Sequence, residues 1–143
     1  MSSLRSAWTF LTMACASGAP SEPVPTLQIV APAEVALVEG QSAEVSVPGA
    51  PAPLVVKFSR ILSDSRCPEH VQCVWAGEVA VLLTYSGEAS GELSLTLPDS
   101  EGSPASGNAG RYRIVLLEVT PYPGHGAPRT PPNRVKLGVT VIP

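Results

Sequence analysis

Residues Ser63 to Tyr85, SDSRCPEHVQCVWAGEVAVLLTY, form the stretch around which the rest of the chain is organised. The stretch holds Cys67, Cys73 and Trp75, and the longest apolar run of the sequence follows a turn at Ala76-Gly77. Two cysteines at this spacing, directly before a strand, predict a small disulfide-closed loop in an oxidising compartment. Loop-closure entropy indicates that such a ring stabilises a fold by about 2–3 kcal/mol.

Three side chains beside the cysteines have expected structural roles. Trp75 is expected to cover the disulfide as part of the core, as a strand tryptophan does in immunoglobulin-like sandwiches, with ligand stacking as the alternative. Asp64 and Arg66 flank the loop, where they are expected to pair with each other or to cap backbone groups.

Outward from this stretch the chain consists of short runs that are typical of strands. Sixteen prolines and twelve glycines punctuate the chain and disfavour long helices. Strands are expected over residues 27–31, 35–38, 43–47, 54–62, 78–85, 91–97, 111–120 and 135–141. The pattern predicts an all-β fold, an antiparallel β-sandwich of seven or eight short strands, with an open barrel as the second choice.

Two further features refine this expectation. The run 54–62 is apolar on both sides, with Val56 and Phe58 on one face and Val55 and Ile61 on the other, which indicates a central strand or a bulge. The polar segment 98–110 and the proline-rich segment 121–133 are expected to be loops.

The N-terminus has the features of an export signal over residues 1–14. Arg5 supplies the positive charge, and the apolar run from Ala7 to Ala14 is too short to cross a bilayer. The segment ending in Cys15 resembles a bacterial lipobox, although Thr12 stands where a large aliphatic residue is usual. This predicts lipidation of Cys15, and simple secretion or a periplasmic location is the alternative. Residues 15–26 are expected to form a flexible tether, followed by the β-sandwich domain over 27–143.

Charge excludes one class of partner. The net charge of −3 is spread without blocks, so the chain has no basic surface for nucleic acid.

The sequence contains few candidate catalytic or metal-ligating residues. Cys67, His70 and Cys73 form a C-x2-H-x2-C cluster, and a metal site that uses His70 with His125 is an alternative to the disulfide. No G-x-S-x-G, S-x-x-K or H-E-x-x-H motif occurs, so we expect a non-enzymatic protein without a cofactor. A hydrolase with an unrecognised site is the remaining enzymatic alternative.

The segment from Asp64 to Gly77, with its D-S-R-C-P and C-x-W-A-G elements, resembles the signature of an uncharacterised family of small exported bacterial proteins, many of them lipoproteins. The later segment 117–123, LEVTPYP, and the closing strand resemble the same family. The resemblance implies an envelope location and a β-rich domain, and it implies no activity.

The expected role is therefore binding or structural support at the cell envelope. A membrane is the expected partner through the lipid anchor, with an envelope protein or a glycan as a possible second partner. The candidate contact loop is 68–72, which displays Glu69, His70 and Gln72 on a ring closed at both ends. The competing interpretation is that this ring only fixes the entry to the next strand.

Overall fold

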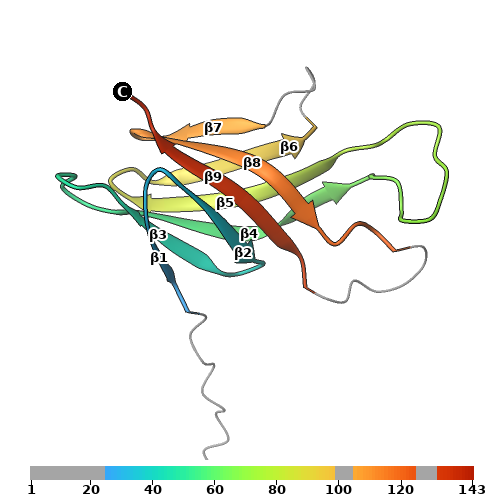
Figure 1. Cartoon of the computed structure of the whole chain (residues 1–143), viewed down its shortest axis with the longest axis horizontal. Helices are drawn as coiled ribbons and strands as arrows, with labels where there is room; N and C mark the ends of the chain where they lie inside the picture. The colour runs from blue at the N-terminus through green and yellow to red at the C-terminus, as the bar shows by residue number, and fades with distance from the viewer. Residues whose placement is uncertain (1–24, 99–104, 125–131) are drawn as a thin grey trace, which may run out of the picture.

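The computed structural model describes residues 25–98, 105–124 and 132–143, and these form two facing β-sheets without a helix (Figure 1). One sheet has the strand order β1-β3-β4-β5-β6 and the other has the order β2-β9-β8-β7. The predicted β-sandwich is confirmed, and the sheets do not close into a barrel. The strands are β1 (Leu27–Val30), β2 (Ala33–Val38), β3 (Ser42–Ser46), β4 (Leu54–Asp64), β5 (Val79–Gly87), β6 (Gly91–Leu97), β7 (Ser106–Ala109), β8 (Tyr112–Thr120) and β9 (Arg134–Val141).

The prediction of seven or eight strands was wrong by one strand. β7 lies within a segment that was expected to be a loop, where it pairs antiparallel with the start of β8. Gly110, with a φ of 62°, allows the tight turn between these strands, and Ala109 is fully buried. The polar composition of the segment 98–110 predicted a loop, although the segment contains the short edge strand β7. The five-stranded sheet is also mixed, because β1 pairs parallel with β3.

The core lies between the sheets and consists of inward-facing side chains from both. Tyr112 and Phe58 are the largest side chains that are completely buried. Most of the remaining core is aliphatic, as expected for a chain with few aromatic residues. The core residues other than these two are Ala31, Val35, Leu37, Ala43, Val45, Leu54, Val56, Val79, Val81, Leu83, Leu95, Ala105, Ala109, Ile114, Leu116, Val119, Val135, Leu137 and Val139.

Two irregularities in β4 decide which side chains face the core. The pairing of β4 with β5 shifts register between Phe58 and Arg60 and again between Ile61 and Ser63. The expected bulge is thereby confirmed, and it returns Ile61 to the core side. The second shift places Asp64 opposite the core residue Val79. A carboxylate consequently enters the end of the sandwich.

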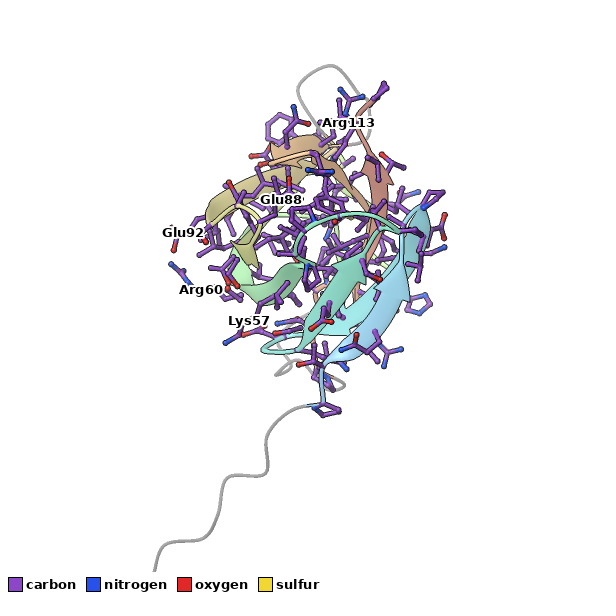
Figure 2. The ribbon with its side chains drawn as sticks, turned by 90° about the vertical axis from the view of Figure 1, so that its left-hand side faces the viewer. Lys57, Arg60, Glu88, Glu92 and Arg113 are labelled. Carbon is purple, nitrogen blue, oxygen red and sulfur yellow. A yellow bond between two sulfur atoms is a disulfide. The ribbon has the colours of Figure 1, made fainter. Side chains whose placement is uncertain are left out.

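The outer face of the five-stranded sheet carries charges of both signs. Lys57, Arg60 and Glu92 are exposed and project away from the ribbon (Figure 2).

No helix in the described residues is long and apolar enough to cross a membrane.

Candidate functional site

Residues 65–78, which we call the disulfide loop, connect β4 to β5 and extend beyond the end of the sandwich (Figure 1). Backbone hydrogen bonds close its base. The amide of Ser65 donates to the carbonyl of Glu78 over 2.8 Å, and the amide of Cys67 donates to the carbonyl of Ala76 over 3.1 Å. The Ser65 hydroxyl also accepts a bond of 3.1 Å from the Glu78 amide. The base of the loop therefore continues the hairpin past the last strand residues.

Gly77 makes this close approach possible. Its φ is 70°, and a Cβ atom at this position would lie 1.9 Å from the carbonyl oxygen of Ser65. Any side chain at position 77 would force the two arms of the loop apart.

Cys67 and Cys73 form a disulfide with a Cα–Cα distance of 5.9 Å, as predicted. Inside the ring, the Val71 amide donates to the carbonyl of Pro68 over 3.3 Å and closes a turn. His70 occupies the third position of this turn with a φ of 65°, and no other described non-glycine residue has a positive φ. The sulfurs are bonded to each other and do not act as thiolate metal ligands in this structure.

The structure places the predicted contact residues on the exterior. Glu69, His70 and Gln72 are all exposed on the disulfide loop. Their contribution to binding stays a prediction.

The expected role of Trp75 as a core residue over the disulfide was wrong. Its side chain is 80% exposed, and the adjacent Val74 is 93% exposed. Trp75 precedes Val79, the first residue of β5, so it lies beyond the part of the hairpin that the second sheet covers. Position next to a cysteine and a strand suggested burial, but the loop extends past the core before the strand begins.

Arg66 instead occupies the buried position at the end of the sandwich. Its side chain is 8% exposed and forms a bidentate ion pair with Asp64, with an Nε–Oδ1 distance of 2.9 Å and an Nη2–Oδ2 distance of 2.7 Å. The Asp64 side chain is 4% exposed. The expected pairing of these two residues is confirmed. Such fork-to-fork pairs combine charge with fixed geometry.

The same guanidinium connects the disulfide loop to the far sheet. It donates through Nη1 to the carbonyl of Val119 and through Nη2 to the carbonyl of Pro121 over 3.1 Å. Its central carbon also lies 4.4 Å from the ring centre of Tyr122. We call Asp64, Arg66 and Tyr122 the arginine clamp. The clamp joins the two sequence segments, 64–77 and 117–123, and sequence reasoning did not anticipate this contact.

A recess lies beside the clamp, and Arg66 and Tyr122 form part of its lining. Its volume is about 200 Å³, and we call it the side hollow. Most of its lining is apolar, and its members are Arg66, Ala76, Gly77, Leu97, Pro98, Leu117, Glu118, Val119 and Tyr122. Ala76 and Gly77, which line this recess, directly follow the exposed Trp75 in the chain.

The chain matches no protein-family model, no curated protein and no solved structure. Inferences about function therefore depend on the geometry of the chain itself.

The remaining predicted site residues, Cys15 and His125, lie outside the described residues. Within the described residues, no group of three or more His, Cys, Asp or Glu side chains is placed to hold a metal ion. A site shared by His70 and His125 consequently has no described geometry.

A second buried polar group lies in the core. The hydroxyl of Tyr112 and the Oε2 atom of Glu88 have no hydrogen-bond partner among the described residues. The other carboxylate oxygen of Glu88 accepts a bond of 2.7 Å from Arg111 Nε. Burial, and secondarily the charge of Glu88, raise the pKa of Tyr112. This phenol is therefore held in its neutral form.

Proposed function

We propose that this protein is a non-enzymatic binding domain anchored at the cell envelope, and that the disulfide loop is its contact surface. The observation that carries the proposal is the exposure of two consecutive apolar residues, Val74 and Trp75, on a constrained loop. Single exposed apolar residues are common, whereas a projecting tryptophan is among the residue types that dominate binding energy at interfaces.

Constraint of the loop favours selective binding. The disulfide, the backbone bonds at the base and the arginine clamp each limit the conformations of the loop. A loop that is already ordered loses less conformational entropy when it binds, so more of its contact energy contributes to affinity. Glu69, His70 and Gln72 add exposed polar groups on the same loop.

Anchoring is the second part of the proposal. A leader over residues 1–14 and a lipidated Cys15 would attach the domain to a membrane through the segment 15–26. This segment has 12 residues and spans at most about 40 Å when fully extended. The anchor would keep the disulfide loop close to other envelope components and raise their effective concentration.

Affinity capture tests the contact surface. Full-length protein would be immobilised and incubated with envelope extract, comparing wild type with a Val74→Ser/Trp75→Ala variant and a Glu69, His70 and Gln72 triple-alanine variant. We expect wild type to retain a defined set of proteins or glycans that the apolar double variant loses at least tenfold. The substituted side chains are exposed, so the free energy of unfolding should stay within about 0.5 kcal/mol of wild type.

Val30→Ser supplies the matched control. Val30 is 59% exposed at the end of β1, away from the disulfide loop (Figure 1). Its variant should retain the wild-type set. Recovery of one unchanged set by wild type, double variant and triple variant, all folded, would remove the contact surface from the disulfide loop.

A further inference from the structure

The accessible charge of the disulfide loop is negative. Arg66 is the only Lys or Arg between positions 61 and 98, and it is buried in its ion pair with Asp64. Glu69 and Glu78 are both exposed on the loop. With the histidine neutral, the loop therefore presents two carboxylates without an accessible cation on it.

The apolar part of the loop lies between these carboxylates in the sequence. Val74 and Trp75 project, and Val71 is 42% exposed. The side hollow of about 200 Å³ includes Ala76, the residue after Trp75, and is also lined by Leu97, Leu117 and Tyr122. The surface thus combines a projecting indole, an apolar recess and negative charge.

The charge and the apolar groups of this surface favour one class of binding partner over the others. Anionic lipid headgroups and a second copy of the same acidic loop would both be repelled by Glu69 and Glu78. A neutral glycan would leave the carboxylates of Glu69 and Glu78 without a partner of opposite charge. A basic protein segment fits both the carboxylates and the indole, because Arg and Lys pair with carboxylates and Arg also stacks on indole faces.

We propose that the disulfide loop binds a protein segment that inserts a large apolar side chain into the side hollow and places Lys or Arg against Trp75, Glu69 and Glu78. The proposal rests on the proposed function, because it names the partner class of the same surface. A recess of this size accommodates a single side chain, so specificity would come from one apolar residue flanked by basic residues.

Selection from a library of random 12-residue peptides tests this chemistry. Full-length protein would serve as the target, and the Val74→Ser/Trp75→Ala variant would be used for counter-selection. We expect enriched peptides to carry a large apolar residue with at least two Lys or Arg residues, and to bind more weakly as salt is raised. A pool without basic residues, or no loop-dependent pool at all, overturns the proposal.

Charge reversal supplies the matched comparison. Glu69→Lys/Glu78→Lys should weaken binding of the selected peptides at least tenfold, whereas Glu92→Lys should leave it unchanged. Glu92→Lys makes the same charge change per substituted residue, on the outer face of β6 (Figure 2). Equal binding by the double charge-reversal variant and Glu92→Lys overturns the proposal.

Lipid vesicles and self-association provide the competing outcomes. A blue shift of Trp75 fluorescence with phosphatidylcholine or phosphatidylglycerol vesicles, lost in Trp75→Ala, would assign the loop to a membrane surface. A loop-dependent dimer in sedimentation equilibrium would assign it to a second copy. Either result overturns the proposed basic partner. The proposed function fails separately, if envelope capture does not depend on the loop.

Discussion

Tyr112 is the largest side chain that the core buries completely, and its hydroxyl lies there without a hydrogen-bond partner in the described residues. A buried polar group in this state contributes apolar contacts through its ring but loses the hydration of its hydroxyl. The sequence identified the strand that carries Tyr112. It could not show whether a hydrogen-bond partner would reach the hydroxyl, since that depends on residues distant in the chain.

Replacement of Tyr112 by Phe should not destabilise the protein at neutral pH. We expect a free energy of unfolding equal to wild type or higher, by up to about 1–3 kcal/mol, because the change removes a desolvated hydroxyl and keeps the ring. Urea denaturation at pH 7 measures this difference. A loss of more than about 1 kcal/mol would show that the hydroxyl has a stabilising partner.

The same variant should alter the response to alkali. The pKa of Tyr112 is raised in the folded state above its ordinary value of 10.0, so the unfolded chain ionises first as pH rises. The stability that the neutral phenol retains below about pH 10 is therefore lost as pH increases towards the folded-state pKa. Wild type should lose more stability between pH 9 and about pH 11 than Tyr112→Phe. Parallel losses in both proteins would contradict this assignment.

At the scale of elements, the disulfide loop is held by three separate devices: a covalent ring, a glycine contact at its base and the arginine clamp. The spacing of Cys67 and Cys73 was sufficient to predict the ring. The pairing of Asp64 with Arg66 was also predictable, since they are two residues apart. The contact of Arg66 with Val119 was not, because these residues come together only when the two sheets pack. The prediction that Trp75 is buried was wrong for a related reason. The sequence does not show how far the β4–β5 hairpin extends beyond the core of the sandwich.

Gly77→Ala tests the contact at the base of the loop, and Gly40→Ala is its matched control. Both glycines have a positive φ, of 70° and 86°, but only position 77 lacks room for a Cβ atom. Gly40→Ala should cost about 1 kcal/mol from backbone strain. Gly77→Ala should cost at least about 1 kcal/mol more, because its Cβ meets the Ser65 carbonyl. Denaturant unfolding compares them, and equal losses would show that the loop base adjusts freely.

Arg66→Ala tests the arginine clamp. The change leaves the Asp64 carboxylate buried without its cation and removes the donors to two backbone carbonyls. We expect a loss of about 3–5 kcal/mol of unfolding free energy. Arg60→Ala, at an exposed position of β4, should change stability by no more than about 0.5 kcal/mol. Similar small losses for both variants would mean that the buried ion pair contributes little.

At the scale of the whole molecule, the regular spacing of short apolar runs and turns was enough to predict a sandwich. The assignment of strands to sheets was not predictable, because consecutive strands β1 and β2 belong to opposite sheets. The parallel pairing of β1 with β3 depends equally on non-local contacts. β7 was missed because Ser106, Gly107 and Asn108 have low strand propensity, and its partner strand determines its conformation.

Location is also a property of the whole chain, and Cys15→Ala tests it. Expressed with its leader in a bacterial host, wild type should enter the detergent phase and carry acyl groups at Cys15, whereas the variant should remain in the aqueous phase. Phase partition and mass spectrometry of the N-terminal peptide measure both properties. Recovery of Cys15→Ala in the membrane fraction in the same amount as wild type would refute the lipid anchor.

The burial of Arg66 has a consequence for proteolysis. From position 61 to position 110 it is the only residue at which a trypsin-like protease could cleave, and the ion pair with Asp64 removes it from reach. A chymotrypsin-like protease meets the opposite situation, because the exposed Trp75 lies outside the disulfide ring. Cleavage there would cut the arm that joins the disulfide ring to β5 and leave β4 and β5 paired in the five-stranded sheet. One nick could thus disable the candidate contact surface while the folded domain persists.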